Sequence, residues 1–222
     1  MSRPAPAFYA LGGGGARDYV TLLHPPYTAW HLSYVVVGAC LAAVVDWWVL
    51  GLTVLAFGLA MGVGAHALDE LNGRPLGTGI PSRVLIGLAV VSVAAATALG
   101  IAVAVAETLW IVPLVVVGVA LVPVYNLELA FHNDVGFAVA WGAFPALTGY
   151  FVEAQTIRVE AVAAAAFALA ASLAQRALST PAREARRREG TTAGTEPLER
   201  ALRLLTWGMV ALAVGLVAAR LR

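Results

Sequence analysis

The fold is decided by two neighbouring apolar stretches, VLIGLAVVSVAAATALGIAVAVA (residues 84–106) and LWIVPLVVVGVALVPVYNL (residues 109–127). Only Glu107 and Thr108 separate them, and neither stretch contains a charged residue. A helix that crosses a bilayer needs about 20 consecutive, mostly apolar residues. The two stretches therefore predict two membrane-spanning helices joined by a tight turn.

Segments of the same kind recur on both sides of this pair. Together they predict an all-α fold, a polytopic transmembrane helical bundle of about seven helices. The expected spans are residues 26–45, 48–68, 84–106, 109–127, 135–152, 159–178 and 202–219. We expect a flexible cytoplasmic N-terminal tail at residues 1–20, and a single transmembrane domain at residues 21–222 with an arginine-rich cytoplasmic loop at residues 179–200.

The composition agrees with a membrane protein. Of the 222 residues, 60% are hydrophobic and only 12% are charged, whereas soluble domains average about 25% charged residues. The net charge is +1, which gives no electrostatic basis for a nucleic-acid partner. We expect an integral protein of a prokaryotic plasma membrane.

The arginines predict the orientation of the bundle, because cytoplasmic loops carry an excess of positive charge. With seven spans, Arg158, Arg220 and Arg222 lie on one face and the other arginines on the opposite face. This places the N-terminus in the cytoplasm and the C-terminus outside.

Most of the chemically versatile side chains fall at the predicted cytoplasmic ends of four segments. Ionisable groups near hydrocarbon are costly and tend to be functional. Two acidic helix faces that meet there would hold Mg²⁺ through carboxylates and water, with a diphosphate completing the shell. The candidate metal ligands are His66, Asp69, Glu70, Glu128, His132 and Asp134.

Other interpretations of this set stay open. The histidines also suit a Zn²⁺ or Fe site of mixed ligands, and the same residues would serve as helix caps and headgroup contacts. The turn at residues 73–81 follows directly, where Arg74 would pair with a phosphate and the glycine-rich backbone would add donors.

In the order of these features the chain resembles the UbiA superfamily of intramembrane prenyltransferases. That family opens its first helix with a proline-containing aromatic stretch and ends its second in an Asp-rich metal motif, an Arg-Pro-Leu turn and a Gly. Its fourth helix ends in a Tyr before a short polar turn and a Gly-rich fifth helix. The corresponding residues here are His24–Trp30, Asp69–Gly79, Tyr125, residues 126–134, Gly136 and Gly142.

The resemblance implies transfer of a prenyl group from a polyprenyl diphosphate to an acceptor that the sequence does not identify. It implies a catalytic role for Asp69, Glu128 and Tyr125, and Mg²⁺ as the cofactor. Arg74, His66 and Asn72 would bind the cofactor and diphosphate. The aromatic residues that would line the prenyl tunnel are Tyr34, Tyr125, Phe137 and Trp141.

The chain departs from the family after its sixth predicted span. Where the family has a second Asp motif, this chain has residues 175–179 and then an arginine-rich run at 181–189, with no aspartate. The run is interpreted as a topology signal that contacts anionic lipid, with phosphate binding as the alternative. Two further functions remain: a lipid-binding or transport protein without catalysis, and a membrane hydrolase built on a His/carboxylate metal site. The expected partners are a polyprenyl diphosphate or another lipid, and the membrane.

Overall fold

The structure is a computed structural model that describes residues 5–12, 14–190 and 192–222. These residues form an all-α polytopic bundle, and no strand occurs in the part described. Segments η1, η3 and η4 are π-helical and η2 is a 3₁₀ turn. The elements are α1 (Ala16–Leu22), α2 (Pro25–Cys40), α3 (Trp47–Phe57), η1 (Gly58–Ala65), α4 (His66–Leu71), α5 (Ser82–Ala106), η2 (Leu109–Ile111), α6 (Val112–Asn126), α7 (Asp134–Ala138), η3 (Val139–Ala143), α8 (Phe144–Ala154), α9 (Val159–Glu184), η4 (Ala185–Glu189) and α10 (Glu196–Arg220).

Six of the predicted spans are confirmed as helices that are long and apolar enough to cross a membrane. They are Trp47–Leu71, Ser82–Ala106, Leu109–Asn126, Asp134–Ala154, Val159–Arg187 and Glu196–Arg220. Some of these spans consist of consecutive helical segments without a break, because η1 joins α3 to α4 and η3 joins α7 to α8. The chain is therefore an integral membrane protein by the length and hydropathy of its helices.

The predicted first span is shorter than expected. It corresponds to α2, whose 16 residues give a length of about 24 Å, less than the roughly 30 Å of a hydrocarbon core. The apolar residues 41–45 lie beyond its end. The Arg220 side chain donates to the carbonyl oxygens of Cys40, Ala42 and Ala43, which closes the last turn of α2 and ends the helix there.

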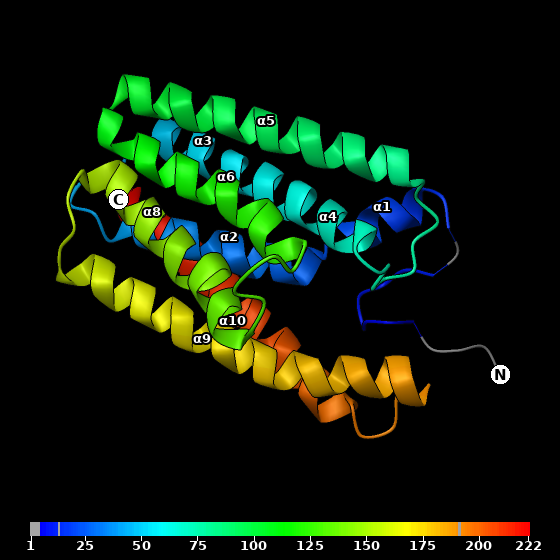
Figure 1. Cartoon of the computed structure of the whole chain (residues 1–222). Coiled ribbons are helices and arrows are strands. Elements are labelled where there is room, and N and C mark those ends of the chain that lie inside the picture. Colours follow the sequence, from blue (N-terminus) through cyan, green and yellow to red (C-terminus); the bar gives the residue numbers. More distant parts are fainter. Residues whose placement is uncertain (1–4, 13, 191) are drawn as a thin grey trace.

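Successive long helices run in alternating directions (Figure 1). As a result α1, the start of α2, the end of α4, the α6–α7 connection and the α9–α10 connection all lie at one end of the bundle, which we call the polar end. Arg222 and the turn before α3 lie at the other end. This alternation brings the chain segments that carry the candidate residues to the same end of the molecule.

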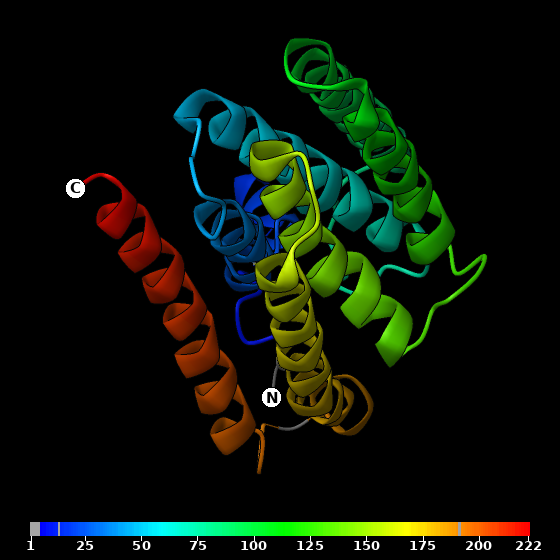
Figure 2. The ribbon, with the colours of Figure 1, turned by 90° about the vertical axis from the view of Figure 1, so that its left-hand side faces the viewer.

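Helix α2 occupies the middle of the bundle, with α3, α8, α9 and α10 around it (Figure 2). Its contact with α8 is the most extensive in the fold, and a glycine of each helix meets the backbone of the other there. A Cβ atom at Gly38 would overlap the carbonyl oxygen of Ala146, and one at Gly149 would overlap the carbonyl oxygen of Val35. Small residues let membrane helices approach in this way.

The predicted cytoplasmic loop at residues 179–200 is mostly helical. Helix α9 continues through Glu184 and η4 through Glu189, so that only residues 190–195 connect them to α10. The hydropathy pattern marks where apolar residues stop, whereas Ala, Arg and Glu are good helix formers that let the helix continue beyond that point.

The predicted N-terminal tail has structure of its own. Residues 16–20 belong to α1, and Tyr9 packs against His24 and Tyr27 at the polar end. Residues 1–4 and 13 of that tail lie outside the described residues.

A reporter inserted after Gly190 and another fused to Arg222 should report opposite sides of the membrane, with Gly190 cytoplasmic. The reason is that α10 crosses once between them and the arginines favour the cytoplasm near Gly190. Alkaline phosphatase and fluorescent-protein fusions measure this, and two reporters on the same side would refute the orientation.

Replacement of Gly149 by Val should destabilise the protein by about 1–3 kcal/mol or more, the usual cost of overpacking, because the added atoms meet the backbone of α2. Thermal unfolding in detergent micelles measures the loss. The matched control is Gly51→Val on α3, where no atom lies within 4 Å of an added Cβ. Equal melting temperatures for the two variants would contradict the close-packing argument.

Candidate functional site

The polar end holds a cavity of about 540 Å³, which we call the polar pocket. Its walls come from α2, the η1–α4 stack, the ends of α6 and α7, η3 and α9. Six of the candidate residues line it, namely His66, Asp69, Asn72, Tyr125, Glu128 and His132. The sequence predicted that His66, Asp69, Glu128 and His132 would converge from separate segments, and all four line this pocket.

Glu70 lies next to Asp69 but serves a different purpose. Its fully buried carboxylate accepts hydrogen bonds from the backbone N–H of Leu76 (2.9 Å), and from the N–H (2.7 Å) and hydroxyl (2.9 Å) of Thr78. These bonds fix the loop between α4 and α5. Adjacent helix positions differ in direction by about 100°, which explains why Glu70 faces the loop while Asp69 faces the pocket.

Arg74, which we predicted to pair with a phosphate, is engaged within its own loop. Its guanidinium donates to the carbonyl oxygens of Thr78 (3.2 Å) and Ile80 (2.6 Å) and to Ser82 Oγ (2.9 Å). The side chain therefore closes its own turn, and it is not among the residues that line the polar pocket.

Asp134 also lies outside the lining of the pocket. It forms an ion pair with Arg176 Nε at 2.8 Å, which joins the start of α7 to α9. Asn72, by contrast, lines the pocket and donates to the carbonyl oxygen of Asn126 at 3.3 Å. This bond ties the end of α4 to the end of α6.

Three histidines of the pocket share one hydrogen-bonding pattern. The Nδ1 atoms of His31, His66 and His132 face the carbonyl oxygens of Trp141 (2.6 Å), Gly62 (3.1 Å) and Tyr125 (3.0 Å). A carbonyl oxygen only accepts, so each Nδ1 carries the hydrogen. In the neutral ring the Nε2 atom is then left as an acceptor.

The fourth histidine, His24, stacks on His66 with ring centroids 4.0 Å apart and meets the Tyr9 hydroxyl at 2.9 Å. It stands just before α2. Burial lowers the pKa of His24 well below its ordinary value. The neighbouring His66 ring and the charge of Arg183 lower this pKa further. His24 is therefore neutral in the folded protein.

Asp69 is the central carboxylate of the polar pocket. Within the described residues its side chain accepts no hydrogen bond from the protein, and the charge of Arg183 only partly offsets the cost of burying this carboxylate. Glu128, on the α6–α7 connection, lies 3.7 Å from His132 Nε2. These two carboxylates come from different segments and face the same cavity.

The described residues contain no group of three or more His, Cys, Asp or Glu side chains arranged to hold a metal ion. The six predicted ligands are therefore not gathered, because Glu70 and Asp134 have other partners. Asp69 and Glu128 remain as carboxylates in the pocket. Mg²⁺ usually takes one or two carboxylates from a protein when substrate phosphates supply further oxygens.

One face of α9 contributes residues that the sequence analysis did not place in the predicted site, although it left phosphate binding open for the run at 181–189. They share a helical spacing of three or four positions, which places them on one side of the helix. That periodicity of polar residues in an alanine-rich span is the signal that would have identified them. They are Gln175, Arg176, Ser179, Thr180 and Arg183, with Arg187 of η4 continuing the row.

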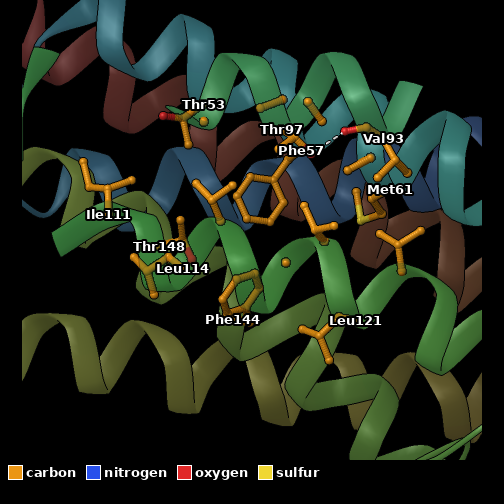
Figure 3. A pocket seen from close by; sticks show the side chains of 18 of the residues that line it. Thr53, Phe57, Met61, Val93, Thr97, Ile111, Leu114, Leu121, Phe144 and Thr148 are labelled. Atoms are coloured by element: carbon orange, nitrogen blue, oxygen red, sulfur yellow. Dashed lines mark hydrogen bonds between the residues drawn. The ribbon is translucent and has the colours of Figure 1, made fainter. Parts of the chain in front are cut away.

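A second, apolar cavity of about 90 Å³ lies deeper in the bundle (Figure 3). Phe57 and Phe144 face each other across it, with ring centroids 6.0 Å apart. Met61 and Trp141 line both this apolar cavity and the polar pocket. The two spaces therefore share a wall, with charged groups on one side and hydrocarbon on the other.

The chain matches no protein-family model, no curated protein and no solved structure. The argument for a function therefore rests on the geometry of the polar pocket and the apolar cavity.

Acidification should destabilise the folded protein through His24. The unfolded chain takes up a proton on this ring below a pH of about 6.5, whereas the folded chain does not, so stability present above that pH is lost as the pH falls. The loss approaches about 1.4 kcal/mol for each pH unit for this group. Thermal unfolding in micelles from pH 7.5 to 5.0, compared with His24→Gln, measures it. Equal pH slopes in the two proteins would contradict the assignment.

Proposed function

We propose that the protein is an intramembrane transferase that moves a prenyl group from a polyprenyl diphosphate to an acceptor. The observation that carries the proposal is the shared wall between the polar pocket and the apolar cavity at Met61 and Trp141. A ligand that fits both spaces has a charged head and a hydrocarbon chain. The resemblance to the UbiA superfamily names such a ligand.

The reaction would begin with cleavage of the allylic C–O bond, whose electron pair leaves with the diphosphate. Cationic groups that face this charge as it develops lower the barrier, and the α9 arginines are the cations that line the pocket. A new bond then forms between the allylic carbon and the acceptor, which releases a proton. The Nε2 atom of His66, which the Nδ1 bond leaves as an acceptor, would take up that proton.

Aromatic rings stand where the allylic cation would form. Tyr125 stacks on His132 at 4.7 Å and meets Trp141 edge to face at 5.8 Å, and Phe137 lies 6.2 Å from Tyr125. The faces of such rings stabilise a nearby cation. Tyr125, Phe137 and Trp141 also line the polar pocket, close to its wall with the apolar cavity.

Magnesium that enters with the diphosphate would be held by Asp69 and Glu128 and would draw charge from the leaving group. Hydrogen bonds within the protein would keep the other groups of the site in position. Asn72 fixes the distance between α4 and α6 through Asn126, and the Nδ1 bonds of His31 and His132 hold their rings in one orientation.

A lipid-binding protein without catalysis is the second candidate. It is favoured by the engagement of Glu70 and Arg74 within their own loop, which removes two groups that the transferase interpretation expected in the site. Such a protein would bind the same amphiphile and release it unchanged.

The purified protein in nanodiscs, given geranylgeranyl diphosphate, Mg²⁺ and a bacterial lipid extract as acceptor source, should release diphosphate. Asp69→Asn should slow the release by about 100-fold or more, because the side chain faces the reacting head group. The matched control is Glu196→Gln on the exposed start of α10, which should keep the wild-type rate. Binding of the lipid without diphosphate release in the wild type would favour the lipid-binding candidate.

A further inference from the structure

The polar face of α9 and η4 differs in chemistry from the rest of the polar pocket. The other walls supply imidazoles, carboxylates, amides and aromatic rings, whereas the guanidinium groups of the pocket all come from this face. Glu184 is the acidic residue of this face. The family that the chain resembles has aspartates at this point in the sequence, and the replacement of acid by base reverses the charge that the wall presents.

Arg183 stands out among the arginines of this region. Arg176 pairs with Asp134 and lies over the Phe137 ring, and Arg186 forms a two-point contact with Glu199 at 2.6 and 2.9 Å. Arg183 is half-buried, and it makes no hydrogen bond or ion pair with the part of the chain that the structure describes. Its side chain lines the polar pocket, as do those of Asp69, His24 and Tyr27.

Two uncharged groups of the same face also lack partners. Gln175 is only 2% exposed and Oε1 of its amide has no hydrogen-bond partner, and the same holds for the buried hydroxyl oxygen of Thr180. Buried polar groups in proteins are nearly always hydrogen-bonded. A buried amide and hydroxyl that line a cavity without partners therefore point to a ligand that supplies them. The oxygen and nitrogen of an amide exchange places by rotation, so Gln175 can donate.

Guanidinium groups bind phosphate oxygens in paired, charge-assisted hydrogen bonds. A row of Arg176, Arg183 and Arg187 along one helix face, with the donors of Gln175, Ser179 and Thr180 between them, matches an anion that extends over more than one phosphate group. We propose that this face of α9 and η4, with Arg183 at its centre, binds the diphosphate through the protein's own side chains, so that binding does not require a metal ion. The identity of the anion as a diphosphate rests on the proposed function.

The test uses the full-length protein in nanodiscs of phosphatidylcholine and follows the binding of inorganic pyrophosphate by calorimetry, in EDTA and in Mg²⁺. Pyrophosphate should bind in EDTA. Arg183→Gln should weaken this binding by between about tenfold and a hundredfold, the range for lost hydrogen bonds to charged groups, and Arg183→Lys should lose part of it because the paired geometry is gone. The matched control Arg200→Gln, whose side chain is exposed on α10, should bind as the wild type does.

A second variant separates ligand binding from folding. Gln175→Met removes an unpartnered buried amide, so it should keep or raise the melting temperature while it weakens pyrophosphate binding. Orthophosphate should bind more weakly than pyrophosphate, since it reaches fewer donors. Binding that needs Mg²⁺, a wild-type affinity in Arg183→Gln, or equal affinity for orthophosphate would each overturn the inference. Arginine-dependent pyrophosphate binding without diphosphate release from geranylgeranyl diphosphate would refute the proposed transferase and leave the anion site standing.

Discussion

The contact between α2 and α8 is the interaction on which the polar pocket depends. Glycines 38 and 149 bring the two backbones so close that no side chain fits between them. Helix α2 then presents His31 to the carbonyl oxygen of Trp141, in the π-helical segment η3 directly before α8. A π-helical turn widens the helix and leaves carbonyl groups without their usual partners. The imidazole of His31 satisfies one of these carbonyl groups and so joins α2 to η3 at the polar pocket.

Hydrogen-bonded polar groups also explain how the loop between α4 and α5 is held beside the polar pocket. An ionisable group near hydrocarbon persists only with partners, and Glu70 has three of them in the loop that follows α4. Arg74 holds the other side of that loop through two carbonyl oxygens and Ser82. These bonds hold the loop without any contribution from the Asp69 side chain, which faces the cavity instead.

Hydropathy alone predicted where the chain crosses the membrane, because the cost of exposing polar groups to lipid acts on every residue of a span. It also predicted that His66, Asp69, Glu128 and His132 would meet, since the ends of alternating helices fall at one face. It did not distinguish Asp69 from Glu70, because that depends on how the helix is rotated. It did not predict that α9 continues to Glu184 and lines the polar pocket, because the arginine-rich segment was interpreted as a loop. The periodic placement of Gln175, Ser179 and Arg183 is present in the sequence, and it marks one helix face once the helix is extended beyond its predicted end at residue 178.

The pocket combines two charge patterns that would act against each other on a diphosphate. Arg183 attracts the anion, whereas Asp69 repels it, and in the free protein Arg183 partly compensates the charge of Asp69 because both side chains line the same cavity. When a diphosphate occupies the cavity, the Arg183 guanidinium would pair with the phosphate oxygens and would no longer compensate the charge of Asp69. A carboxylate so placed must then find a proton or a metal ion between itself and the anion. The arginine face would therefore govern whether the head group binds, and Asp69 with Glu128 would govern the step in which a cation is needed to release it. A protein that kept the first function and lost the second would be a binder of the same lipid, which is why the binding and release of diphosphate are separate properties of this site.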